Sequence, residues 1–343
     1  TNCTDTGTIR VAVNGTLRAQ TQATVAGTWS IASVVQPAAS DVITVFIDGV
    51  VAADDRTVAV TTYDGTGDIL GLELIEGRLS IGNNDNRTVT NANLSQYDNS
   101  VSGDADVIHE VNATNDLTVD FNSAITTGEE LYIKSGNIFQ PASAGGGDVN
   151  SYNIEILGTF TADSNVITAS GSWDDNGTFT AGTSTLTMSG TSQTLDASTF
   201  NNLTINPSSA GTITASGSFT VSGTLDVAAS DTLSIPSGAI ITHSGATLTL
   251  NGTISGAGRL AYQSSTAFPT TGTISSILRF DATNNAQTMS NRTYGGLVEI
   301  YKTGAIARTV TMSAGTHTLS GALNIIEDGT NNLTLDGGTN NPI

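Results

Sequence analysis

Apolar and polar residues alternate along most of the chain, in short runs that end at turn residues. The clearest example is GSWDDNGTFTAGTSTLTMSG at 171–190, in which TFTA and TLTM are bounded by Gly, Ser or Asn. A period of two places successive side chains on opposite faces of a β-strand, so Phe179, Leu186 and Met188 face away from the threonines. Threonine stiffens a strand, and its hydroxyl hydrates the outer face without charge. The pattern predicts short strands that bury little surface individually.

The same alternation continues from about residue 150 to residue 343. No sustained helical stripe with caps interrupts it. Strands this short are stabilised when successive coils cover one another, which predicts a parallel β-solenoid. At about 20–25 residues per coil, the segment forms roughly eight or nine coils. The predicted inward side chains are Phe179, Leu186, Met188, Leu203, Ile205, Ile213, Phe219, Leu225, Leu233, Leu248 and Leu250.

A longer internal repeat lies within the predicted solenoid. Residues from 185 onward align with residues from 277 onward, and similar segments follow in both copies. Among the matched pairs are Gln193 with Gln287 and Phe200 with Tyr294. We interpret the repeat as a duplicated block of several coils, at about 185–238 and 277–338.

Residues 1–65 predict a separate immunoglobulin-like β-sandwich. TIRVAVNG alternates and stops at Asn14-Gly15, a strong hairpin signal. Further strands are predicted in GTWSIASV, DVITVFIDG and RTVAVTTY, and short strands at this spacing are typical of a sandwich. Trp29 is expected to anchor the core. Residues 66–149 are predicted to form a connector and the first solenoid coils, so the fold class is all-β.

This order of parts resembles that of very large secreted surface proteins of bacteria and archaea. In those proteins an immunoglobulin-like module precedes Thr/Gly-rich parallel β-solenoid repeats. The resemblance rests on WDDNGTFTAGTSTLTMSGTSQTL for the repeat and on TIRVAVNGTL, GTWSI and DVITVFIDG for the module. It implies an extracellular or cell-surface location and a structural or adhesive role, and it carries over no catalytic residue.

Charge narrows the range of partners. The chain has 31 acidic and 11 basic residues, a net charge of −20 and only 12% charged residues. Nucleic acid is not expected as a partner because phosphate binding needs clustered Lys and Arg. Membrane insertion is not expected either, because no apolar run is long enough.

The single cysteine, Cys3, cannot form an intramolecular disulfide. Because the sequence starts at Thr1, we expect a mature or excised segment, either a polymer subunit or part of a longer polypeptide.

The chemistry-bearing residues do not predict an enzyme. His109, His243 and His317 lie far apart, amid polar turn residues and without the spacing of zinc ligands. We therefore assign no catalytic residue and no residue that binds an organic cofactor. The chain contains neither a nucleophile elbow nor a phosphate-binding loop.

Calcium and sugars are the remaining candidate ligands and modifications. Asp104 and Asp106 in SGDAD, and Asp174 and Asp175 in WDDNG, are candidate calcium ligands, although WDDNG is read first as a turn. Sequons of the Asn-Xaa-Ser/Thr type are candidate glycosylation sites. They begin at Asn14, Asn86, Asn93, Asn112, Asn176, Asn202, Asn251, Asn291 and Asn332.

These observations predict an extracellular structural protein. We expect a subunit or repeat segment of a surface filament, sheath or stalk, assembled head-to-tail from copies of the chain. The alternative is an adhesin whose solenoid displays an N-terminal module that binds surface glycans. A third hypothesis is a polysaccharide-active β-helix enzyme, since such enzymes use carboxylate clusters on one sheet face.

Overall fold

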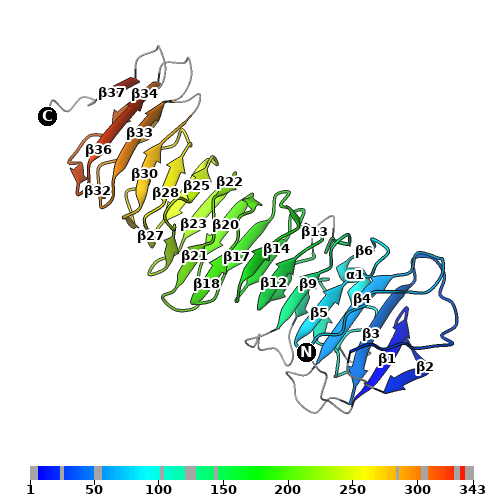
Figure 1. The fold of residues 1–343 in the computed structure, drawn as a ribbon. Helices are drawn as coiled ribbons and strands as arrows, with labels where there is room; N and C mark the ends of the chain where they lie inside the picture. Colours follow the sequence, from blue (N-terminus) through cyan, green and yellow to red (C-terminus); the bar gives the residue numbers. More distant parts are fainter. Residues whose placement is uncertain are drawn as a thin grey trace. The chain divides into compact units, whose positions relative to one another are not determined.

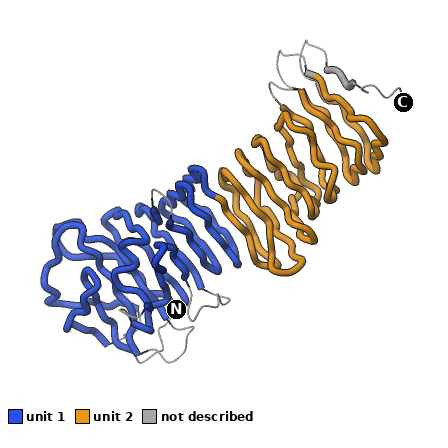
Figure 2. Tube along the Cα trace, turned by 180° about the vertical axis from the view of Figure 1, so that it is seen from behind, with its two compact units in different colours: residues 1–184 blue, residues 185–343 orange. Residues whose placement is uncertain are grey.

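The structure is a computed structural model of the 343-residue chain. It describes residues 7–23, 27–49, 56–100, 104–119, 129–142, 146–282, 286–302, 308–327 and 333–336. The fold is all-β, and a parallel β-solenoid of about 12 turns covers residues 57–326, so the predicted fold class is confirmed to that extent. The chain forms two compact units, residues 1–184 and residues 185–343 (Figure 2).

The first unit begins with four antiparallel strands in the order β2-β1-β3-β4. These strands are β1 (Thr8–Val13), β2 (Thr16–Ala23), β3 (Val42–Asp48) and β4 (Thr57–Thr62). Asn14 and Gly15 join β1 to β2 with φ angles of 45° and 73°. A type I′ turn needs these left-handed values at both central residues, so the predicted hairpin is confirmed.

An immunoglobulin-like sandwich is not confirmed. All described strands of residues 7–62 belong to one sheet. Residues 27–39, which include the predicted strand GTWSIASV, contain neither helix nor strand, so that prediction is wrong. Trp29 in this segment packs against the apolar face of the sheet, as do side chains of the irregular residues 64–75. Irregular chain thus covers the face that a second sheet would cover in a sandwich.

In the first unit, the coils of the solenoid contribute short strands to three parallel sheets (Figure 1). β4 pairs in parallel with β5, so the antiparallel strands pass directly into the first sheet, β5-β9-β12-β15. The second sheet is β6-β10-β13-β16, and the third contains β8, β11 and β14. The strands are β5 (Arg78–Ile81), β6 (Thr88–Val89), β8 (Leu117–Val119), β9 (Glu130–Ile133), β10 (Ile138–Phe139), β11 (Val149–Ser151), β12 (Asn153–Ile156), β13 (Thr159–Thr161), β14 (Val166–Ala169), β15 (Trp173–Asp175) and β16 (Thr178–Thr180).

An insertion lies between β6 and β8. It contains the short helix α1 (Asn91–Leu94) and β7 (His109–Val111), which pairs antiparallel with β8. Thr90 caps α1, because its side chain accepts the N–H of Asn93 while the side chain of Asn93 accepts the N–H of Thr90. The insertion separates β5 from its partner β9 by a long stretch of sequence.

The second unit repeats the three-strand coil. Its main sheets contain β18-β21-β24-β27-β29, β19-β22-β25-β28-β30-β33-β36 and β17-β20-β23-β26, and two short sheets pair β31-β34-β37 and β32-β35. The strands are β17 (Thr185–Met188), β18 (Ser192–Leu195), β19 (Thr199–Phe200), β20 (Asn202–Ile205), β21 (Thr212–Ala215), β22 (Phe219–Val221), β23 (Thr224–Val227), β24 (Thr232–Ser234), β25 (Ile240–His243), β26 (Thr247–Leu250), β27 (Thr253–Ser255), β28 (Arg259–Tyr262), β29 (Thr273–Ile274), β30 (Ile277–Phe280), β31 (Gln287–Met289), β32 (Thr293–Tyr294), β33 (Val298–Lys302), β34 (Arg308–Met312), β35 (Thr318–Leu319), β36 (Leu323–Glu327) and β37 (Leu333–Asp336). Strands of the first sheet begin at residues 192, 212, 232, 253 and 273, so successive strands of this sheet are 20 or 21 residues apart.

Continuous apolar columns form the core of the solenoid. Parallel register places equivalent residues of successive strands over one another, and one such column contains Leu186, Leu203, Leu225 and Leu248. All the side chains predicted to point inward are buried except Phe179. Phe179 lies on β16, the terminal strand of its sheet, and is partly exposed, with its ring centroid 4.8 Å from that of Trp173.

The outward face of the second unit's first sheet carries hydroxyl groups at successive positions. Each strand from β18 to β27 contributes two outward Ser or Thr side chains, and β29 contributes one. The in-register columns are Ser192, Thr212, Thr232, Thr253 and Thr273, and Thr194, Thr214, Ser234 and Ser255. The predicted division between apolar interior and hydroxyl exterior therefore holds along this sheet.

The two segments that we aligned as a duplicated block share a local motif rather than a place in the coil, and their duplication stays a prediction. β17 and β30, which begin the two aligned blocks, belong to different sheets. Gln193 and Gln287 are nevertheless both buried, and each Oε1 accepts a main-chain N–H from just before its strand. The donors are Gly190 at 2.9 Å and Ala282 at 3.0 Å.

Candidate functional site

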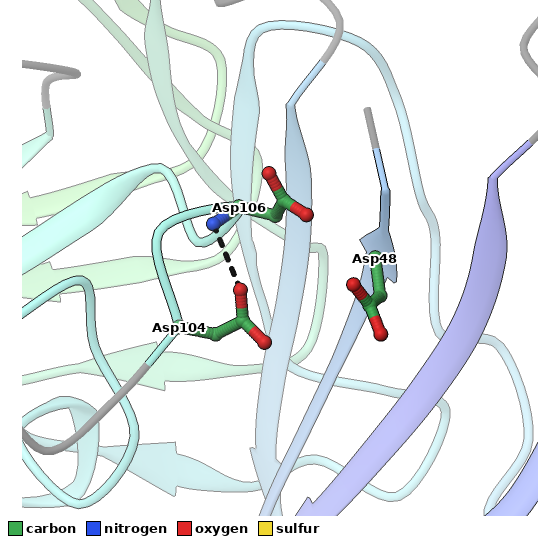
Figure 3. Close-up of side chains that lie close together, drawn as sticks. All are labelled: Asp48, Asp104 and Asp106. Atoms are coloured by element: carbon green, nitrogen blue, oxygen red, sulfur yellow. Dashed lines mark hydrogen bonds between the residues drawn. The ribbon is translucent and has the colours of Figure 1, made fainter. Parts of the chain in front are cut away.

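The structure brings Asp104 and Asp106, two of the predicted calcium ligands, together with Asp48 (Figure 3). One carboxylate oxygen from each residue lies within 4.8 Å of the other two. Asp48 ends β3, whereas Asp104 and Asp106 belong to the insertion before β7. Sequence reasoning missed Asp48 because it is far from the other two along the chain.

Main-chain N–H groups hold two of these carboxylates in place. Asp104 accepts the N–H of Asp106 at 3.0 Å, and Asp106 accepts the N–H of Gly49 at 2.6 Å. Burial raises the pKa of the Asp104 carboxyl, and the carboxylates of Asp48 and Asp106 raise it further. The cluster thus concentrates negative charge, which favours a cation.

Two arginines already supply positive charge to this cluster. Arg10 forms an ion pair with Asp48 at 2.9 Å, and Nε of Arg56 lies 3.9 Å from Asp106. Calcium takes six to eight oxygens at about 2.3–2.6 Å, and three converging carboxylates fit part of such a set. Arg10 competes for Asp48, however, so the contacts present make the cluster an anchor between β3 and the insertion. Calcium binding by Asp104 and Asp106 stays a prediction.

The side chains of Asp174 and Asp175 stabilise the turn that follows β15. They lie on β15, where neighbouring side chains point to opposite faces of the sheet. Oδ1 of Asp174 accepts from Nδ2 of Asn176 at 2.6 Å, and Oδ1 of Asp175 accepts the N–H of Gly177 at 3.3 Å. Neither residue belongs to the group of three potential metal ligands found among the described residues.

Two of the three histidines lie in strands rather than among polar turn residues, so that prediction is wrong for His109 and His243. Both side chains are fully buried, on β7 and β25. In all three histidines Nε2 contacts a main-chain carbonyl, which requires the proton on Nε2 in the neutral ring. The carbonyls are those of Leu94 for His109 at 3.2 Å, Thr247 for His243 at 2.9 Å and Ser313 for His317 at 2.8 Å.

Burial of the histidines makes stability depend on pH. Burial lowers the pKa of His109 to about 4, below the value of about 6.5 in an unfolded chain. Burial lowers the pKa of His243 as well. Between these two pH values the unfolded chain binds a proton that the folded chain does not, so the free energy of unfolding falls as the pH falls. For His109 the loss is about 3 kcal/mol at the lower limit of the window.

We therefore expect the midpoint of thermal unfolding to fall between about pH 7 and about pH 4.5, and to fall less steeply in His109→Gln. The glutamine amide keeps a donor for the carbonyl of Leu94 but does not titrate. Thermal unfolding followed by circular dichroism across this pH range tests the expectation. Equal slopes for the variant and the parent would show that His109 does not carry the effect.

A groove of about 880 Å³ lies between the antiparallel strands and the irregular segments above them. Trp29 and Leu70 are among its wall residues, and Leu70 is 60% exposed. The hydroxyl of Tyr63 donates to the carbonyl of Gly67 at 2.9 Å and accepts from Nε2 of Gln36 at 3.0 Å, which ties the two walls together. The floor is apolar and contains Val11, Val13, Ile43 and Val45. The sequence did not predict this groove, because it depends on irregular chain crossing the sheet.

Most of the candidate glycosylation sites in the described part of the chain are exposed. Asn93 and Asn202 are half-buried, and Asn332 lies outside the described residues, as does Cys3. The exposed asparagines are Asn14, Asn86, Asn112, Asn176, Asn251 and Asn291. Glycosylation at these sites stays a prediction.

Comparison of the chain with protein-family models, curated proteins and solved structures finds no match in any of the three. The parallel β-solenoid is therefore established by the structure alone, and the resemblance to large secreted surface proteins is not confirmed as a family relationship. Within the described ranges, no helix combines the length and apolar composition needed to cross a membrane.

Proposed function

We propose that the protein is an extracellular structural protein, a subunit or repeat segment of a surface filament, sheath or stalk. The observation that supports this most directly is the in-register stacking of parallel coils around apolar columns. Each coil covers the next, so such a stack is extended by adding coils of the same kind. The hydroxyl-rich exterior keeps it hydrated with little charge. These properties suit a structural protein that acts as a spacer at a cell surface.

The last described coil supports head-to-tail assembly. Val298 and Ile300 on β33 are fully buried, whereas Ile325 on β36, the register partner of Ile300, is 55% exposed. β36 is also the terminal strand of its sheet among the described residues, as β2 is in the first unit. Terminal strands pair readily with a strand of another chain through main-chain hydrogen bonds. In our proposal, the last coil of one copy meets the antiparallel strands of the next, and this contact propagates because it is heterologous.

Ile325→Lys tests this proposal. We expect the variant to fold like the parent, because the side chain is already more than half exposed, and to form fibres at least about tenfold shorter, because a lysine on an edge strand opposes the addition of another strand. Val166→Lys is the matched control, since Val166 is 41% exposed and lies on β14 of the first unit. Fibre lengths come from electron micrographs and particle sizes from light scattering. Fibres of equal length in both variants would rule out the last coil as the contact.

An adhesin is the second candidate function. The groove beside Trp29 favours it, because aromatic side chains over an apolar floor suit the apolar faces of sugar rings. Retention of the purified protein by a glycan array would distinguish an adhesin from a purely structural subunit. The third hypothesis, a polysaccharide-active enzyme, stays a prediction from the sequence.

A further inference from the structure

Two charged clusters on outward sheet faces have opposite composition. The acidic cluster, in the first unit, consists of Arg78, Glu130, Glu155 and Tyr132 on the adjacent strands β5, β9 and β12. Arg78 forms ion pairs with Glu130 and, at 3.2 Å, with Glu155. Its guanidinium lies 4.2 Å from the centroid of the Tyr132 ring. One arginine thus stands between two glutamates.

The basic cluster, in the second unit, consists of Glu299, Arg259, Arg279 and Tyr301 on the adjacent strands β28, β30 and β33. Glu299 accepts from Arg259 at 2.8 and 3.1 Å and from Arg279 at 2.7 Å. The guanidinium of Arg279 lies 4.0 Å from the centroid of the Tyr301 ring. Here one glutamate stands between two arginines, which are two of only 11 basic residues in the chain.

Neither cluster balances its own charge. Burial raises the pKa of the Glu130 carboxyl, and Glu155 raises it further against the opposing effect of Arg78. Burial would also raise the pKa of Glu299, but hydrogen bonds from Arg259 and Arg279 outweigh it and lower that pKa. The first cluster therefore has a carboxylate in excess and the second a guanidinium in excess.

The groups in excess are accessible to a partner. The side chains of Glu155 and Arg279 are 24% and 15% exposed. Arg279 directs Nε to Glu299 at 2.7 Å, so the edge of the guanidinium formed by its two Nη groups is directed elsewhere. A planar guanidinium with two N–H donors on one edge matches the two oxygens of a carboxylate.

We propose that the basic cluster of one copy binds the acidic cluster of a second copy. Together the two clusters contain three guanidinium groups and three glutamate carboxylates, so each excess charge meets its opposite. The same contact offsets locally the repulsion between chains that each carry a net charge of −20. The contact joins two different surfaces, which lie on different units of the chain, so it is heterologous. After one contact has formed, each copy still has one unoccupied cluster that can bind a further copy.

This contact rests on the proposed structural function only in requiring that copies associate. It depends on side-chain charge, whereas the contact at β36 depends on main-chain edges. The charge test is therefore made in chains that all carry Ile325→Lys, which alters neither cluster. If copies do not pair through β36, the test of the charged clusters still gives a result. If the charged clusters do not bind each other, the test of β36 still gives a result.

Ionic strength gives the first measurement. At about 0.01 M salt the screening length is about 30 Å and the repulsion between whole chains opposes contact, whereas at about 1 M it is about 3 Å and the ion pairs are screened as well. We expect association, followed by sedimentation velocity, to be strongest near 0.1 M, where the screening length is about 10 Å. Association that rises steadily up to 1 M would mean that apolar surface drives it, which overturns the proposal.

Two neutral variants give the decisive measurement. Glu155→Gln keeps the ion pair of Arg78 with Glu130, and Arg279→Gln keeps the pair of Arg259 with Glu299, so neither leaves a buried charge unpaired. We expect each variant alone to associate at least about tenfold more weakly than the parent. An equimolar mixture should form dimers that do not grow further, because one variant retains the acidic cluster and the other the basic cluster.

Glu110→Gln is the matched control, because it removes one exposed carboxylate on β7 outside both clusters. We expect it to associate like the parent. If the mixture behaves like either variant alone, or if only one of the two variants loses association, the clusters do not bind each other and the proposal fails.

Discussion

Leu203→Asp is expected to destabilise the second unit by more than about 4 kcal/mol. Leu203 has no exposed surface and lies in the column between Leu186 and Leu225. An aspartate there finds no cationic partner, so it either buries a charge or takes up a proton at a cost in free energy. Because each coil is covered by its neighbours, the loss extends to the coils on both sides.

Chemical unfolding measures this loss, and amide hydrogen exchange shows how far it spreads. Thr214→Asp is the matched control, since it adds the same charge at an exposed outward position of β21. Surface changes of this kind stay within about 0.5 kcal/mol. Equal losses in the two variants would mean that inward and outward positions have been assigned wrongly.

Gly245→Ala is expected to cost about 3 kcal/mol or more. Gly245 and Gly223 occupy the same corner of successive coils, and a Cβ on Gly245 would overlap the carbonyl oxygen of Gly223. Both groups belong to the main chain, so no side-chain rotation relieves the overlap. The coils must separate, which weakens the pairing of β23 with β26 and of β22 with β25.

Gly217→Ala is the control within the same unit. The nearest atom to its added Cβ is that of Ala197 at 3.6 Å, an ordinary contact. An alanine that fits restricts the unfolded chain and changes stability by less than about 1 kcal/mol, in the stabilising direction. Thermal and denaturant unfolding of the two variants compare the sites directly. Similar stabilities would show that the stacked corners tolerate a methyl group.

Local alternation predicted the solenoid well because the side-chain period of a strand is a local property. Leu203 and Ile205 could be assigned to the interior from their own tetrapeptide. The same rule places His243 inside, two residues after the inward Ile241, although its polar neighbours suggested a place among turn residues. GTWSIASV failed for a different reason. Alternation does not say whether a run has a neighbouring strand to pair with, and Ser33, with a φ of 62°, interrupts the extended backbone.

The charged clusters could not be predicted, because they depend on which strands become neighbours. Arg78 meets Glu130 only because the insertion between β6 and β8 loops out and lets β5 pair with β9. Asp48 meets Asp104 and Asp106 through the same insertion. The spacing of these residues along the sequence does not indicate that they meet. The register of the coils determines which side chains become neighbours.

The two hydroxyl columns on the second unit's first sheet determine which mutations this part of the sequence can accept. Strands lie about 4.8 Å apart, and outward residues recur about every 6.6–6.8 Å along a strand, so the hydroxyls form a two-dimensional grid. Ser and Thr can exchange at any point without altering the grid, as Thr212 beside Ser192 and Ser234 beside Thr214 illustrate. Inserting one residue within a strand, by contrast, turns its hydroxyls inward and its apolar side chains outward. The face thus tolerates drift in composition, while deletions and insertions are confined to the corners between strands.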